Sequence, residues 1–157
     1  MQNILAAIAT LGPVGLMPAP GTAGSLAALM MAGLITHQTG VMGLLICLVI
    51  ITIVAFPAIT AYTRKTGVHD AGPVIIDEVI GQWLPLLLLP PFSMNAVSLI
   101  GYGLAFVLFR LFDILKPGPI RRAETLPGSA GVIADDVLAG IAAGIILMLI
   151  MGVWRMA

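Results

Sequence analysis

The chain has 157 residues, 60% of them hydrophobic and only 9% charged, and its formal net charge is zero. An ordinary soluble domain has about 25% charged residues, so these values exclude a soluble globular domain, and a neutral chain offers no basic surface for nucleic acid. Acidic and basic residues are absent from residues 1–63, 79–109 and 137–154, and each stretch can hold a membrane-crossing helix of about 20 apolar residues. The sequence therefore predicts one domain over residues 1–157, an all-α, polytopic helical bundle embedded in a lipid bilayer.

The N-terminal half is predicted to contain two short segments and one full-length span. Residues 4–17 are apolar but interrupted by a Gly-Pro pair, which favours an interfacial or re-entrant helix and leaves open whether the segment spans the bilayer. Residues 18–25 contain two prolines and two glycines, a composition typical of a loop. A short helix is expected over residues 25–35, with Ser25 as its N-cap, and residues 40–62 form the first full-length span.

The C-terminal half is predicted to contain a helical hairpin followed by a last span. Two apolar segments, residues 79–89 and 94–115, flank the Pro90-Pro91 pair, which marks the turn. The first segment covers only about 16 Å at 1.5 Å per residue, less than the hydrocarbon core of about 30 Å, so it is re-entrant, tilted or shielded by neighbouring helices. The last span is expected over residues 136–154, capped by one of the aspartates at its start.

A hairpin returns the chain to the face of the membrane that it left, so residues 64–78 and 110–136 share one face. Residues 18–25 return to the same face through the preceding hairpin. Six of the seven basic residues lie in these connecting segments, and the positive-inside rule then makes this face cytoplasmic. These six are Arg64, Lys65, Arg110, Lys116, Arg121 and Arg122. We therefore expect an interfacial active site on the cytoplasmic side of the membrane.

Five acidic residues lie in the same interfacial layer, at the ends of apolar helices. A carboxylate in such a position is costly unless it has a cation or several hydrogen-bond donors. Oxygen ligands without cysteine and with little histidine favour Mg²⁺ or Mn²⁺ over zinc. Adjacent residues on a helix point about 100° apart, so one member of an adjacent pair can bind metal while the other caps a helix, pairs with arginine or acts as a base. The five acids are Asp77, Glu78, Asp113, Asp135 and Asp136.

Basic residues accompany these acids at helical spacing. Arg110, Asp113 and Lys116 follow each other at intervals of three residues, which brings them to one side of a helix end. Arg121 follows in the next loop. A metal held by carboxylates beside such cations is what a phosphate-binding site requires. The alternative is that charges at helix ends only snorkel to the surface or pair with one another. His69 is either a plain loop residue or a metal ligand, phosphate donor or general acid.

Four motifs in this layer, at residues 20–26, 69–83, 109–121 and 128–140, resemble the phosphatidylglycerophosphatase A family in both order and separation. They read PGTAGSL, HDAGPVIIDEVIGQW, FRLFDILKPGPIR and GSAGVIADDVLAG. Members of this family are bacterial membrane enzymes that remove the terminal phosphate from phosphatidylglycerophosphate. The resemblance implies a Mg²⁺-dependent phosphatase with an all-helical fold that makes phosphatidylglycerol on the cytoplasmic leaflet of the bacterial inner membrane.

The resemblance also implies roles for individual residues. Carried over position by position, the candidate metal ligands are Asp77, Glu78, Asp113, Asp135 and Asp136; the candidate catalytic residues are His69 and these acids without Asp135; and the candidate phosphate-binding residues are Lys116, Arg121, Arg110, Thr22 and Ser25. Asp70 also matches the family pattern. Gly118 stands where the family usually has Trp, and Ser129 stands where Gly is usual. Neither change removes a charged group, but Trp favours the headgroup layer, so its loss bears on lipid specificity.

Two other functions are weighed against a phosphatase. A CDP-lipid phosphotransferase also clusters aspartates near Mg²⁺, but its signature needs a glycine directly after the first aspartate, and Asp135-Asp136-Val137 does not fit. A small cation-coupled transporter is expected to carry its acids at mid-span, whereas these lie at span ends. Attack of a metal-activated water on phosphorus is therefore favoured. The catalytic base, the number of metal ions, the range of lipid phosphates and the oligomeric state are left open.

Overall fold

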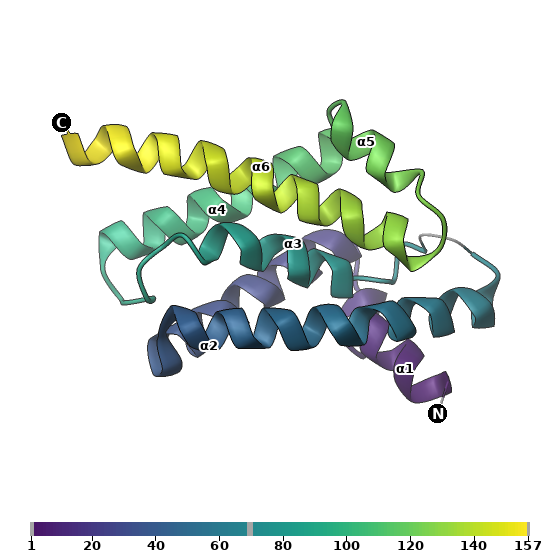
Figure 1. Cartoon of the computed structure of the whole chain (residues 1–157). Coiled ribbons are helices and arrows are strands. Elements are labelled where there is room, and N and C mark those ends of the chain that lie inside the picture. Colours follow the sequence, from purple (N-terminus) through teal and green to yellow (C-terminus); the bar gives the residue numbers. More distant parts are fainter. Residues whose placement is uncertain (1, 69–70, 157) are drawn as a thin grey trace.

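The computed structural model of the chain describes residues 2–68 and 71–156, and every regular element in these two ranges is a helix. The prediction of an all-α fold is confirmed. In chain order the elements are α1 (Gln2–Ala9), the 3-10 helix η1 (Val14–Leu16), α2 (Pro20–Thr66), α3 (Ile76–Leu86), α4 (Ala96–Leu115), α5 (Pro119–Glu124) and α6 (Ser129–Met156) (Figure 1).

Three helices of the described chain, α2, α4 and α6, are long and apolar enough to cross a membrane. α2 changes direction at Gly40, whose backbone angles (φ 70°, ψ −174°) are not helical, and Figure 1 shows the helix folding back there. At 1.5 Å per residue its two parts, residues 20–39 and 41–66, are about 30 Å and about 39 Å long, enough for a hydrocarbon core of about 30 Å. The chain is thus a polytopic membrane protein, as predicted, and the first predicted hairpin turns at Gly40.

The short helix α3 lies at the centre of the bundle and packs against α2, α4 and α6 (Figure 1). Almost all of its residues are buried, and the Trp83 indole donates a hydrogen bond to the Ala28 carbonyl of α2 at 2.8 Å. α3 is only about 16 Å long, but a short helix at membrane depth is stable where protein rather than lipid surrounds its ends. Of the three alternatives for this segment, shielding by neighbouring helices is the one that the structure shows.

α3 and α4 form the predicted hairpin around Pro90-Pro91. α3 ends at Leu86 and α4 begins at Ala96. The Asn95 side chain caps α4, because its amide oxygen accepts a hydrogen bond from the Ser98 N–H at 2.9 Å. The start of α3 and the end of α4 therefore lie together at the other end of the bundle, where the acidic residues of both helices are found.

The predicted loop at residues 18–25 is mostly helical, so this prediction is wrong. α2 begins at Pro20, and proline is favoured in the first turn of a helix because its missing N–H is not needed there. Ser25 is not an N-cap, since its hydroxyl donates a hydrogen bond to the Gly21 carbonyl one turn earlier, at 2.9 Å. The glycines that indicated a loop instead permit close packing against α3, as described below.

The predicted start of the last span is also wrong. α6 begins at Ser129, so Asp135 and Asp136 lie within the helix and neither of them caps it. Each has only 4% of its surface exposed. Arg121 and Arg122 likewise lie in the last turn of the short helix α5 rather than in a loop. The early start of α6 carries two carboxylates into the protein interior instead of leaving them at the membrane surface.

α1 has 8 residues and is therefore about 12 Å long, too short to cross the bilayer. It packs against α2. The Ala9 carbonyl at its end accepts a hydrogen bond from the Ile75 N–H at 3.0 Å. The N-terminal segment thus holds in place, through this hydrogen bond, the stretch of chain that leads into α3.

Candidate active site

A close contact between α3 and α6 sets the position of two aspartates. A Cβ atom on Gly140 would collide with the carbonyl oxygen of Gly81, and a Cβ on Gly81 would lie 2.7 Å from the carbonyl oxygen of Asp136. Small residues at such positions let helix backbones approach closely. Asp77 precedes Gly81 by one helical turn, and Asp136 precedes Gly140 by one turn. Since residues four apart share a helix face, the glycine contact brings Asp77 and Asp136 opposite each other.

A third aspartate comes from α4. The ring of Phe109 covers Gly81, in the same layer as the glycine contact, and Asp113 follows Phe109 by one turn. The Asp136 carboxyl interacts with those of Asp77 and Asp113 and is within hydrogen-bond reach of Asp113. Three helices therefore place three carboxyl groups together, one helical turn away from the tightly packed layer of Gly81, Gly140 and Phe109. We call Asp77, Asp113 and Asp136 the aspartate cluster.

The chemistry of the aspartate cluster follows from its burial. Asp77 has 6% of its surface exposed and Asp136 has 4%, so water screens their negative charges poorly. Carboxylates that share a buried site cannot all stay ionised without a cation or a shared proton. Within the described ranges, no three acidic, histidine or cysteine side chains are arranged as a preformed metal site. The cluster can therefore hold a proton between carboxyl groups or contribute one or two oxygen ligands to a cation.

Arg110 of α4 is the cation beside the aspartate cluster. Its Nη1 atom donates hydrogen bonds to the Asp113 carboxylate at 2.6 Å and to the Glu78 carboxylate at 3.4 Å. It also donates to the Ser25 hydroxyl of α2 at 3.4 Å. These contacts link α2, α3 and α4, and they fix a guanidinium group, which can bind a phosphate through two parallel hydrogen bonds, at the edge of the cluster.

The Glu78 carboxylate lies against the first turn of α2. A Cβ atom on Gly21 or on Gly24 would collide with its oxygens, so both glycines are needed for this approach. The N-terminus of a helix carries a partial positive charge and favours an anion. The glycine-rich motif of α2 therefore faces a carboxylate of the protein itself, a partner that the sequence did not reveal.

A second ion-pair network lies beside the cluster, between α4, α5 and α6. The Lys116 ammonium donates to Asp135 at 2.6 Å and to Glu124 at 3.0 Å. Partial burial acts to lower the pKa of Lys116, but the hydrogen bonds and negative charges of Asp135 and Glu124 outweigh it and raise that pKa above its ordinary value. Lys116 is therefore fully charged at neutral pH.

The two adjacent acid pairs divide in the same way. Asp77 faces the aspartate cluster while Glu78 binds Arg110, and Asp136 faces the cluster while Asp135 binds Lys116. This division follows from the angle of about 100° between neighbouring side chains on a helix. Of the alternatives left open for the second member of each pair, the structure shows pairing with a basic residue.

The remaining predicted site residues lie elsewhere or outside the described ranges. Thr22 and Arg121 have exposed side chains, and neither forms a hydrogen bond or ion pair with another side chain in the part of the chain that the structure describes. His69 and its neighbour Asp70 lie outside the described residues. The structure therefore brings together the five predicted acids, two of the predicted cations (Arg110 and Lys116) and Ser25.

Gln82 is a buried polar residue near the site that was not among the predicted site residues. Its side chain is fully buried, and its amide oxygen and nitrogen have no hydrogen-bond partner among the described residues. Gln82 follows Glu78 by one turn and therefore shares its face of α3. A buried amide without partners costs about 1–3 kcal/mol. A polar residue four positions after an acid in an otherwise apolar helix was the signal that could have identified it.

Comparisons with known proteins point to one family along almost the whole chain. The family model for phosphatidylglycerophosphatase A matches residues 7–151. The chain is 36% identical over 160 residues to phosphatidylglycerophosphatase A of Haemophilus influenzae, with 95% of each chain covered. It is 38% identical over 136 residues to phosphatidylglycerophosphatase A of Escherichia coli, with 84% of this chain and 75% of that protein covered. No solved structure matches the chain.

Proposed function

This chain belongs to the phosphatidylglycerophosphatase A family, and we propose that it hydrolyses the terminal phosphate of phosphatidylglycerophosphate to give phosphatidylglycerol and inorganic phosphate. The observation that carries this proposal is the aspartate cluster, placed beside Arg110 at the ends of membrane helices. A phospholipid keeps its acyl chains in the bilayer, so a phosphatase for its headgroup needs polar catalytic groups at this depth.

Mg²⁺ fits the residues of the aspartate cluster, and we propose that one or two of the carboxylates of Asp77, Asp113 and Asp136 supply its protein ligands. Mg²⁺ prefers carboxylate oxygens and usually takes only one or two of them, with water and substrate phosphate completing its coordination. When bound, Mg²⁺ would neutralise phosphate oxygens and lower the pKa of a bound water. Glu78 and Asp135, expected from the sequence as ligands, instead hold cations in this proposal.

The residues of the chain then act on the phosphate mainly through charge and position, as is general for phosphoryl transfer. Arg110 and Lys116 offset the negative charge that the phosphoryl oxygens carry in the transition state. A carboxylate of the cluster accepts a proton from the attacking water. The bond between phosphorus and the glycerol oxygen breaks, and that oxygen takes up a proton as phosphatidylglycerol leaves.

We also propose that the site faces the cytoplasm. Residues 64–78 and 110–136 hold six of the seven basic residues, and basic residues near membrane helices favour the cytoplasmic side. The polar contacts of Glu78, Arg110 and Lys116 all lie at this end of the bundle. The substrate would then be a lipid of the inner leaflet of the bacterial inner membrane.

Phosphate release from vesicles tests the function. The purified protein is incubated with vesicles that contain phosphatidylglycerophosphate, with Mg²⁺ or with EDTA. We expect inorganic phosphate and phosphatidylglycerol in equal amounts with Mg²⁺, and neither with EDTA. Absence of phosphate release with Mg²⁺ would refute the phosphatase. Phosphate release that EDTA leaves unchanged would refute the role of the metal.

A further inference from the structure

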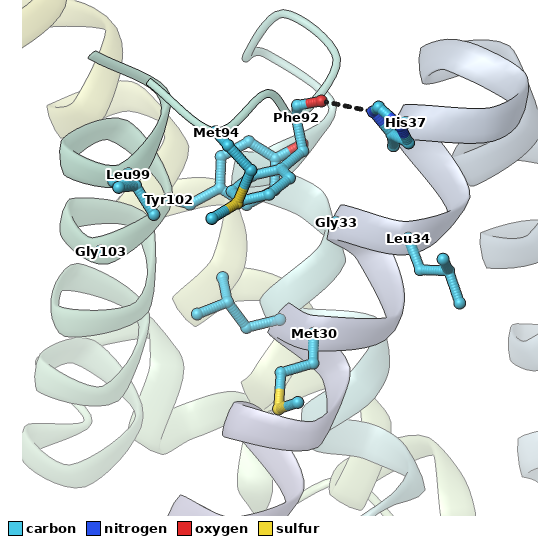
Figure 2. A pocket seen from close by; sticks show the side chains of 10 residues that line it. Met30, Gly33, Leu34, His37, Phe92, Met94, Leu99, Tyr102 and Gly103 are labelled. Atoms are coloured by element: carbon cyan, nitrogen blue, oxygen red, sulfur yellow. Dashed lines mark hydrogen bonds between the residues drawn. The ribbon is translucent and has the colours of Figure 1, made fainter. Parts of the chain in front are cut away.

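A cavity of about 500 Å³ lies between the first part of α2 and the start of α4 (Figure 2). Its volume is within the range of about 300–1,000 Å³ that is common for ligand pockets. It is separate from the aspartate cluster, and no residue of the proposed mechanism lines it. Its walls include Met30, Gly33, Phe92, Leu99 and Gly103.

The walls of this cavity are mostly apolar, and the polar groups of Tyr102 and of the Phe92 backbone are bound to other protein atoms. The Tyr102 hydroxyl and the Phe92 N–H both contact the Thr36 hydroxyl, at 2.8 Å and 3.2 Å. The His37 Nδ1 atom lies 3.2 Å from the Phe92 carbonyl oxygen, a contact that Figure 2 shows. Apart from the exposed His37 ring, what a ligand meets is hydrocarbon, aromatic ring and sulfur. Such a surface suits an alkyl chain and not a charged headgroup.

The rim of the cavity is also apolar and exposed. Met30, Leu34, Met94 and Leu99 line the cavity and each has more than half of its surface exposed. Met30 lies in the middle of the first part of α2, whereas Met94 lies in the connection between α3 and α4, so the cavity extends from the middle of the bundle toward its turns. Where the rim lies within the bilayer, its exposed apolar side chains meet the hydrocarbon chains of lipids.

The two helices that form the cavity also lead to the aspartate cluster. On α2, Gly33 lies eight residues from Ser25, a rise of about 12 Å. On α4, Gly103 lies seven residues from Arg110, a rise of about 10 Å. One leaflet is about 15 Å deep, which is half of a hydrocarbon core of about 30 Å. An acyl chain whose headgroup is bound at Arg110 therefore reaches the near end of the cavity, at Gly33 and Gly103, with its last few carbons.

We propose that this cavity binds the end of one acyl chain of the phospholipid substrate and so makes the enzyme selective for long acyl chains. The inference rests on the proposed lipid phosphatase function. The chain moves from one hydrocarbon environment to another, so the gain comes from packing rather than from the hydrophobic effect. Binding energy at such a remote part of a substrate can be used to position the reacting group, and we expect a selectivity of about tenfold.

Filling the cavity tests the proposal. A Cβ atom on Gly103 has no neighbour within 4 Å, and a Cβ on Gly33 lies 3.6 Å from the Phe92 ring, so a larger side chain can enter without a backbone clash. The kcat/KM of Gly103→Leu and of Gly33→Ala is measured in mixed micelles with dihexadecanoyl and with dioctanoyl phosphatidylglycerophosphate. An octanoyl chain has half the length and does not reach the cavity. The matched control is Ile53→Phe, which adds bulk to an exposed apolar position on the second part of α2.

We expect Gly103→Leu to lower the ratio of kcat/KM for the long substrate over the short one by about tenfold, and Gly33→Ala to lower it less. Ile53→Phe should leave the ratio unchanged. An unchanged ratio in Gly103→Leu would overturn the proposal and show that the cavity holds only bulk lipid. An equal loss with both substrates would overturn it in favour of a structural effect. Inactivity of the wild-type protein on both substrates would refute the proposed function instead.

Discussion

The glycine contact between α3 and α6 predicts a large effect from the smallest possible substitution, Gly81→Ala. The added Cβ would lie 2.7 Å from the carbonyl oxygen of Asp136 and would collide with the Phe109 ring. Ordinary contact begins at 3.4 Å, so α6 or α3 must retreat by about 0.7 Å. A backbone carbonyl cannot rotate out of the way in a close-packed interior. The shift therefore carries Asp136 away from Asp77.

The expected magnitude follows from this displacement. A misplacement of about 1 Å can cost about 10²-fold in rate, so we expect Gly81→Ala to lower kcat/KM by about 10- to 100-fold. Overpacking costs about 1–3 kcal/mol, which leaves the protein folded. The assays are phosphate release in mixed micelles and thermal unfolding in detergent. The control is Gly152→Ala in α6, where a Cβ has no neighbour within 4 Å. Wild-type activity in Gly81→Ala would refute the claim that this contact positions the cluster.

Three further predictions concern the buried polar groups. Lys116→Met should destabilise the fold by about 3 kcal/mol, because the buried Asp135 carboxylate loses the cation with which it pairs. Combining Lys116→Met with Asp135→Asn should cost less stability than the sum of the two single changes. Additive losses of stability in detergent unfolding would contradict an interaction between the two residues. The raised pKa of Lys116 means that its charge stabilises the fold fully at pH values below the usual lysine pKa of about 10.4, and that the stabilisation declines above it. The stability difference between wild type and Lys116→Met should therefore be constant from neutral pH to about pH 10 and shrink at higher pH; a difference that shrinks near neutral pH is the opposite result. Gln82→Met should raise stability by about 1–3 kcal/mol, since it removes a buried amide without partners, whereas a loss of stability would show that the amide is satisfied in the folded protein.

The architecture at the level of spans and turns could be predicted from the sequence because hydropathy and proline act locally. The stretches without charge gave the membrane helices, and Pro90-Pro91 gave the turn between α3 and α4. Gly40 lies at the first predicted hairpin turn, where a positive φ favours glycine. These features depend on a few neighbouring residues and on the thickness of the bilayer.

The helix starts could not be predicted because tertiary contacts decided them. Gly21 and Gly24 lower helix propensity and so indicated a loop, but in the structure they make room for the Glu78 carboxylate. The start of α6 was predicted at Asp136, whereas the helix extends back to Ser129. Asp135 can be buried there because Lys116, which follows the end of α4, pairs with it.

Which residues belong to the candidate site could be predicted better than which partner each of them binds. Helical spacing showed that adjacent acids point apart, but not which member of a pair meets a cation. That choice depends on where Arg110 and Lys116 arrive from α4. Gln82 was missed because an uncharged residue inside an apolar run looks like part of the core.

The catalytic role of the aspartate cluster is tested most directly with the Asp77→Asn and Asp136→Asn variants. Their phosphate release from phosphatidylglycerophosphate vesicles is measured with Mg²⁺ present. Loss of an acid or base group typically lowers a rate by about 10²- to 10⁴-fold, and we expect a loss of that size in each folded variant. Glu124→Gln, which neutralises an acid outside the aspartate cluster, should retain most of the activity. Full activity in both aspartate variants would contradict the assignment of the cluster to catalysis.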